Sequence, residues 1–154
     1  MMKLCCDVLR ILAGRTLVTA ESCTGGGIGA ALTAVPGSSA VYKGGIVSYC
    51  NEVKHTLLGV DGQILESCGA VSAPVAESMA LEARNLLKAD VSVSVTGLAG
   101  PDGDDFGNPV GLVYIGYADA RTVLSKEFRF SGSREQIREQ AVCAALQVVL
   151  RMNA

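Results

Sequence analysis

The chain has 154 residues, of which 49% are hydrophobic and only 5% aromatic, and its formal net charge is −2. This length suits one domain with its own core, and the apolar content excludes a disordered chain. The sequence has no Trp and no basic run, which argues against a nucleic-acid partner. No apolar stretch approaches the ~20 residues that a membrane span requires, so no membrane partner is expected either.

The six cysteines predict reduced thiols rather than disulfides or a metal site. Their spacing contains no C-x-x-C pair and no other metal-ligand pattern, and several lie in apolar runs. Reduced and mostly buried thiols are typical of a cytosolic protein. Asp7 and Arg10 interrupt the first apolar stretch, so it does not read as a signal peptide and a cytoplasmic location is expected.

Hydrophobic spacing predicts helices and strands that alternate along most of the chain. Apolar residues three or four positions apart indicate helices, and short β-branched runs indicate buried strands. In chain order the expected elements are a helix over 4–12, a strand over 16–20, a helix over 24–34, a strand over 41–49, helical segments over 52–58 and 61–66, a helix over 74–87, strands over 91–96, 110–118 and 122–130, and a helix that opens at 131–135 and runs to about 152.

Local signals refine these elements. Gly44 and Gly45 predict a bulge or a close approach within their strand. Asn51 is the expected N-cap of the helix after it, and Ser133 with Gln136 predicts a capping box for the last helix. The short connection between the last two strands predicts an antiparallel hairpin. Strands separated by helices predict a largely parallel sheet covered on both faces, here with one antiparallel strand.

The stretch 16–29 predicts a strand-to-helix turn that carries a candidate nucleophile. Its glycines allow a substrate to approach the backbone, and the first N–H groups of the helix can bind an anion or a developing oxyanion. Ser22 would lie there as a nucleophile or only as a helix cap. Cys23 is the rival nucleophile, since a helix N-terminus favours a thiolate, unless it is a small buried packing residue.

Two residues are candidates for the base that would accept the Ser22 proton. His55 is the only histidine, and no acidic residue stands out as the group that would orient it. Lys54 would serve if burial kept its amine neutral, although a solvated surface lysine is the more common case.

Further segments carry groups that suit a nucleotide. The small-residue loop 96–101 would cradle a phosphate or ribose through its backbone N–H groups, or form an ordinary turn. Arg134 and Arg138 would grip a phosphate, or else pair with Glu135 and Glu139 on the surface.

Two other patterns are weak. Residues 25–30 match G-x-G-x-x-A, but no acidic residue ends the next strand as a dinucleotide site requires. Asp102, Asp104 and Asp105 lack the full spacing of a calcium loop and predict a solvated loop.

Short segments spread in order over nearly the whole chain form a specific pattern when they are taken together. They are 20–26 (AESCTGG), 35–39 (VPGSS), 44–54 (GGIVSYCNEVK), 57–60 (LLGV), 69–72 (GAVS), 95–101 (VTGLAGP), 109–116 (PVGLVYIG) and 130–138 (FSGSREQIR). Through them the chain resembles the CinA C-terminal domain family. The resemblance implies an amidohydrolase that converts nicotinamide mononucleotide (NMN) and water to nicotinic acid mononucleotide and ammonia.

The resemblance also implies a fold and a set of site residues. The fold is a three-layer α/β/α sandwich with a mixed, mostly parallel sheet of about five strands, as one domain over 1–154. Ser22 is the implied nucleophile and Lys54 the base, with Tyr49 beside them, and His55 has no role. The implied substrate-binding residues are Thr24, Gly25, Gly26, Asn51, Thr96, Gly97, Ala99, Gly100 and Arg134.

No metal or cofactor is expected, because the protein itself supplies the nucleophile and the oxyanion donors. The expected partner is the small nucleotide substrate, and the apolar excess predicts a homo-oligomer. Many relatives carry a separate N-terminal domain that this sequence lacks, so only the amidohydrolase activity is implied. The loop 102–108 is more acidic than the Gly-rich, Lys-bearing loop of the family. If that loop meets the substrate, weaker phosphate contacts or a different preferred substrate are expected.

Two alternatives remain open at the level of sequence. One is a module that binds a nucleotide without hydrolysing it. The other keeps the amidase chemistry and uses Cys23 as the nucleophile.

Overall fold

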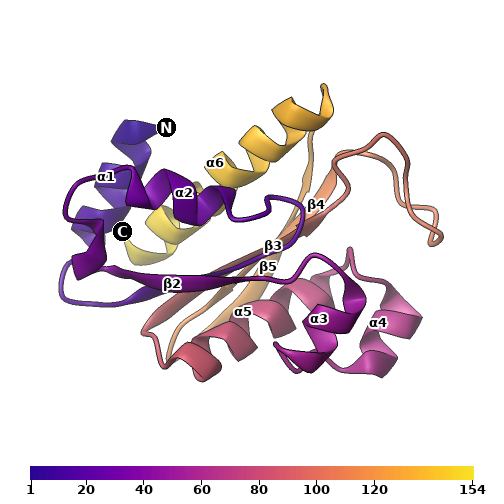
Figure 1. Cartoon of the computed structure of the whole chain (residues 1–154), viewed down its shortest axis with the longest axis horizontal. Coiled ribbons are helices and arrows are strands. Elements are labelled where there is room, and N and C mark those ends of the chain that lie inside the picture. Colours follow the sequence, from indigo (N-terminus) through magenta and orange to yellow (C-terminus); the bar gives the residue numbers. More distant parts are fainter.

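Figure 1 shows a computed structural model of residues 1–154, in which a five-stranded sheet lies between two layers of helices. The helices on one face are α1 (Met2–Ile11), α2 (Gly27–Thr33) and α6 (Arg134–Asn153). Those on the other face are α3 (Asn51–Thr56), α4 (Gly62–Cys68) and α5 (Ala73–Leu87). This arrangement confirms the three-layer α/β/α sandwich.

The sheet is mixed, with three parallel strands on one side. The strands are β1 (Leu17–Glu21), β2 (Tyr42–Val47), β3 (Val91–Gly97), β4 (Leu112–Ala118) and β5 (Val123–Arg129), in the spatial order β2-β1-β3-β4-β5. β1 pairs in parallel with β2 and β3, and β4 is antiparallel to both β3 and β5. The predicted hairpin and the single antiparallel strand are confirmed. The carboxyl ends of β1, β2 and β3 therefore meet at one edge of the sheet.

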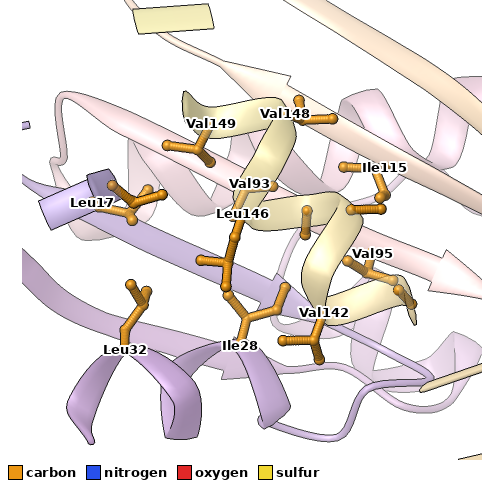
Figure 2. Packing of buried hydrophobic residues seen from close by; sticks show 14 of the residues in the cluster. Leu17, Ile28, Leu32, Val93, Val95, Ile115, Val142, Leu146, Val148 and Val149 are labelled. Atoms are coloured by element: carbon orange, nitrogen blue, oxygen red, sulfur yellow. The ribbon is translucent and has the colours of Figure 1, made fainter. Parts of the chain in front are cut away.

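Side chains on the two faces of the sheet build two separate hydrophobic cores. Figure 2 shows the larger one, where Ile28 and Leu32 of α2 face Leu146 of α6 and Leu17 of β1. The next residue of β1, Val18, belongs to the other core, beneath α5. Because successive side chains point to opposite faces, a strand buried on both sides must be apolar throughout, as the start of β1 is.

The predicted irregularity in β2 is confirmed at its glycines. The register passes from Leu17 opposite Tyr42 to Val18 opposite Gly44, so one extra residue bulges out of β2. A Cβ atom added at Gly45 would lie 2.1 Å from Thr19 Oγ1. Only glycine lets the two strands approach this closely.

Two predicted helix starts are wrong. α2 begins at Gly27 and not at 24, because Gly25 and Gly26 have φ values of +59° and +98°, outside the helical region. Asn51 is the first residue of α3, and Cys50 is the N-cap. The capping box of α6 is confirmed, since Ser133 Oγ accepts from the Gln136 amide while Gln136 Oε1 accepts from the Ser133 amide.

All six cysteines are free thiols. The expectation that most are buried holds for Cys5 and Cys23 and is wrong for Cys50 and Cys68, which are exposed. In none of the helices does an apolar stretch reach the length needed to cross a bilayer.

Candidate active site

Ser22 lies at the carboxyl end of β1, the middle strand of the parallel part of the sheet. Its amide donates to the Val95 carbonyl at 3.0 Å, so its backbone continues the β1–β3 ladder. Its side chain opens into a cavity at this edge, where open α/β sheets bind their ligands. The sequence therefore places a hydroxyl on rigid backbone at the mouth of a pocket.

Lys54 reaches Ser22 from α3, the helix that follows β2. The residue is only 1% exposed, and its Nζ donates to Ser22 Oγ at 2.9 Å and to the Ser48 carbonyl at 2.7 Å. Ser48 is itself held to β1, because its amide donates to the Glu21 carbonyl at 2.9 Å. Both hydrogen-bond partners of Lys54 are thus fixed to β1.

Burial makes the Lys54 amine easier to deprotonate. It lowers the pKa of Lys54 from 10.5 to about 8, against smaller opposing effects of Cys50 and Cys23. No carboxylate lies within ion-pair distance of its Nζ. With this pKa about a tenth of the amine is neutral at pH 7, far more than for an ordinary lysine, and a general base must be neutral.

Cys23 lies beside this pair, but burial keeps its thiol in the unreactive, protonated form. Burial raises the pKa of its thiol to about 11 and outweighs the lowering by its backbone hydrogen bond, Lys54 and Arg138. The expectation that a helix N-terminus favours the thiolate is wrong here, because α2 begins four residues later. The geometry favours Ser22 over Cys23 as the nucleophile.

Glu21 occupies the N-terminus of α2, a role that the sequence analysis did not assign. Its buried carboxylate accepts from the Ile28 amide at 2.8 Å, the Gly29 amide at 3.1 Å and Thr24 Oγ1 at 2.7 Å. The helix N-terminus is therefore filled by a carboxylate of the protein and is not open to a substrate anion. A charged residue at the end of an otherwise apolar strand was the available signal.

The turn after Ser22 retains three free amides. Gly25 donates its N–H to the Ser22 carbonyl at 3.0 Å, whereas the N–H groups of Cys23, Thr24 and Gly26 have no acceptor in any other residue. Thr24, Gly25 and Gly26 do not line the cavity, because the Thr24 side chain turns inward to Glu21. Of the three free amides, only that of Cys23 belongs to a residue that lines the cavity.

Arg138 of α6 supports the same turn from the other side. Its Nε donates to the Cys23 carbonyl at 3.0 Å and its Nη2 to the Thr24 carbonyl at 3.3 Å. It forms no ion pair with Glu135 or Glu139, so the predicted surface pairing is wrong. The guanidinium holds the backbone of the turn.

A cavity of about 440 Å³ opens above Ser22 and Lys54. This volume lies within the range of small-molecule sites. Most of the predicted site residues line it, drawn from the end of β3, from the segments after β1, β2 and β3, and from α3 and α6. They are Ser22, Tyr49, Asn51, Lys54, Thr96, Gly97, Ala99, Gly100 and Arg134.

Arg134 joins two walls of this cavity. Its Nη1 donates to the Gly100 carbonyl, and its Nη2 donates to the Tyr49 hydroxyl at 3.1 Å. Tyr49 is 62% exposed and stands at the mouth. The first residue of α6 thus links the loops that follow β2 and β3.

The loop after β3 brings acidic side chains to the cavity, which the sequence analysis did not predict. Asp102, Asp104 and Asp105 lie on its wall together with Phe106. Asp104 shapes the loop, since it accepts from the Asn108 amide at 3.0 Å and from Asn108 Nδ2 at 2.8 Å. Burial raises the Asp104 pKa, but these bonds and that from Phe106 outweigh it and lower the pKa.

Phe106 closes over the backbone at Gly69. A Cβ atom at Gly69 would lie 2.8 Å from the ring, and the φ of +76° already favours glycine there. The aromatic ring is half exposed and lines the same cavity as the aspartates. No three acidic, His or Cys side chains come together as a set that would hold a metal ion.

His55 lies outside the cavity that Ser22 and Lys54 line. Its Nδ1 is 2.7 Å from the Val60 carbonyl, within the connection that leads to α4. The histidine thus stabilises a local turn, and the hydroxyl–lysine pair has no imidazole beside it.

Comparison with known proteins agrees with this architecture. Residues 3–153 match a family model described as the CinA C-terminal domain. A CinA-like protein from Thermosynechococcus vestitus is 51% identical over 149 residues, covering 94% of this chain and 36% of that protein. A putative competence-damage inducible protein from Caldanaerobacter subterraneus is 44% identical, covering 94% and 35%. The chain therefore spans about a third of the length of these curated relatives.

Solved structures are similar over the whole chain. A CinA superfamily protein from Klebsiella pneumoniae superposes with a TM-score of 0.96 at 33% identity, covering 99% of this chain and 96% of that one. The competence/damage inducible protein CihA from Agrobacterium tumefaciens gives a TM-score of 0.95 at 39% identity, covering 99% and 95%.

Proposed function

Since the chain belongs to the CinA C-terminal domain family, we propose that it is an amidohydrolase acting on a nicotinamide nucleotide. The substrate would be NMN, and the products nicotinic acid mononucleotide and ammonia. The observation that carries the proposal is the 2.9 Å contact between Ser22 Oγ and the buried Lys54 Nζ. A hydroxyl paired with a desolvated amine is the arrangement that nucleophilic attack on an amide needs.

In the first half of the reaction Ser22 attacks the carboxamide carbon. The neutral Lys54 amine accepts the Ser22 proton as the Oγ–C bond forms, along the contact that is already 2.9 Å long. The oxyanion is stabilised by the free amide of Cys23, the residue of the turn after Ser22 that lines the cavity. The lysine ammonium then gives its proton to the leaving nitrogen as the C–N bond breaks, and ammonia departs.

In the second half water hydrolyses the acyl-enzyme. Lys54 accepts a proton from the water as its oxygen attacks the ester carbon. When the bond to Ser22 Oγ breaks, the same proton returns to the serine. Atoms and protons balance over the cycle, and the lysine ends in its starting form.

The charges on the cavity wall suggest how NMN lies. Arg134 is the one cation on the wall besides Lys54 and suits the phosphate. The pyridinium ring carries a positive charge, which suits the face of Phe106. Tyr49 and Asn51 line the same cavity and offer further polar contacts.

Ammonia release from NMN, measured with EDTA present, tests the proposal. Purified wild type should be active, and Ser22→Ala and Lys54→Ala should each lose about 10³-fold in kcat. His55→Ala is the matched control, because His55 neighbours Lys54 in sequence and lies outside the cavity. Near-wild-type turnover by Ser22→Ala, or abolition by the chelator, would refute the serine mechanism.

The same preparation separates the two alternatives. NMN binding by calorimetry without any ammonia release would favour a nucleotide-binding module. Inactivation in step with labelling of Cys23 by a thiol reagent, together with an inactive Cys23→Ala variant, would favour the cysteine mechanism. The protonated, buried state of Cys23 predicts slow labelling and an active variant.

A further inference from the structure

The hydroxyl of Ser48 is buried and has no hydrogen-bond partner, unlike any other buried side-chain polar atom of the chain. Buried hydroxyls elsewhere are satisfied; Ser94 Oγ, for example, donates to the Ala76 carbonyl at 2.5 Å. Leaving a buried polar group unpaired is unfavourable, so an orphan of this kind calls for an explanation. The explanation lies in its neighbour.

Lys54, in contrast, has one N–H donor without an acceptor. A lysine ammonium carries three N–H donors, and Lys54 Nζ has two acceptors, Ser22 Oγ and the Ser48 carbonyl. The carbonyl that accepts at 2.7 Å belongs to the same residue as the orphan hydroxyl. One donor and one acceptor are therefore both unsatisfied in the same buried place.

We propose that Ser48 Oγ is the third acceptor for the Lys54 ammonium, reached directly by rotation about χ1 or through one water molecule. This makes Ser48 a positioning residue, since it acts on the reaction through Lys54 and does not touch the substrate. Its place in turnover rests on the proposed function, because the ammonium forms when Lys54 takes the Ser22 proton. The contact itself does not depend on turnover.

The surroundings make this acceptor important. The titratable groups facing Lys54 are Cys23 from the turn after β1 and Cys50 before α3. Across the cavity lie Tyr49, Arg134 and the aspartates of the loop after β3, and none forms an ion pair with Nζ. With no carboxylate at hand, the charge on Nζ is stabilised by hydrogen-bond acceptors alone. Removing one of three must change how readily the amine is protonated.

The test compares Ser48→Ala with wild type by two readouts. The first is the pH titration of the Lys54 ¹³Cε signal in protein with ¹³C-labelled lysine, assigned by its loss in Lys54→Met. We expect Ser48→Ala to lower the titration midpoint of Lys54 by about one pH unit. The second is ammonia release, where kcat at the alkaline plateau should fall about tenfold with KM unchanged.

A second variant and a control keep the test decisive. Ser48→Cys keeps nearly the same shape with a weak acceptor, and should shift the midpoint in the same direction. Ser92→Ala removes another buried hydroxyl, which donates to the Ala80 carbonyl far from the cavity, and should leave the Lys54 midpoint unchanged. An unchanged midpoint in both Ser48 variants would overturn the proposal. Absence of amidase activity in wild type would overturn the proposed function and leave the titration readout intact.

Discussion

Lys54 is an ionisable side chain that the fold buries without an acidic partner, and this has a cost in stability. The difference between its ordinary pKa of 10.5 and the value of about 8 in the folded chain corresponds to ~3 kcal/mol. A side chain that destabilises the fold and contacts Ser22 has the character of a functional residue.

We predict that Lys54→Met stabilises the folded protein while abolishing activity. Methionine fills a similar volume and requires no desolvation of a charge, so the free energy of unfolding at pH 7 should rise by about 1–3 kcal/mol. For a chain of this length that is a rise in Tm of a few degrees. Thermal and urea unfolding of the variant and of wild type check it, and a Tm below that of wild type would contradict it.

The stability difference between Lys54→Met and wild type depends on pH because folding lowers the pKa of Lys54. Between pH 8 and 10.5 the unfolded chain binds a proton at Lys54 that the folded chain does not, so wild-type stability rises with pH in this window. The difference in the free energy of unfolding between Lys54→Met and wild type should therefore shrink over the same range.

The lowered pKa also sets the pH dependence of activity. The kcat/KM of wild type should rise with pH through about 8, as the neutral amine is formed.

At the scale of elements, the turn 22–26 is fixed from three directions. Ser22 joins the β1–β3 ladder, Glu21 binds the first amides of α2, and Arg138 of α6 holds the carbonyls of Cys23 and Thr24. The turn has few contacts of its own, so its conformation depends on these neighbours. The free amides of the turn are a result of that support.

Glu21→Gln tests the most buried of the three supports. The amide oxygen of glutamine accepts as the carboxylate does, but its NH₂ group would face a donor, the Gly29 amide or Thr24 Oγ1. We expect the free energy of unfolding to fall by about 2–4 kcal/mol, measured by urea unfolding. Glu66→Gln on the exposed face of α4 is the control and should change it little. Equal stability of the two variants would contradict this role.

The acidic loop after β3 should set the charge preference of the cavity. NMN carries a net negative charge, so replacing Asp102 and Asp105 with Asn should lower its KM by about threefold at low salt, with a smaller effect at high salt. Nicotinamide riboside lacks the phosphate and is cationic, so its KM should rise in the same variant. Steady-state kinetics with both compounds check this, with Glu66→Gln as control. A shift in the same direction for both substrates would contradict the electrostatic account.

At the scale of the whole molecule, the sequence predicted the layers of the fold well. Strands such as 91–96 carry a β-branched residue at every second position, and helices such as 74–87 carry Pro near the start, so both leave clear local signals. The resemblance to a family identified Ser22 and Lys54 as the pair, and the structure brings their side chains together. Their roles in catalysis stay predictions.

What the sequence could not supply depends on tertiary contacts. The start of α2 is set by two positive φ angles, and the role of Glu21 by the distance to amides seven and eight residues on. The thiol of Cys23 is protonated because of its burial, which no local pattern reveals. The aspartates of the loop after β3 reach the cavity only through the path of the chain between β3 and β4.

The backbone amides of Ser22 and Ser48 both belong to the ladder around β1, whereas the segment between β3 and β4 extends from the sheet edge as a loop (Figure 1). We therefore expect the contact between Ser22 and Lys54 to break only when the surrounding core unfolds, so that its lifetime equals that of the folded state. The loop can exchange its residues without disturbing that pair. Changes in the loop can thus alter which ligands the cavity admits while Ser22 and Lys54 stay where they are.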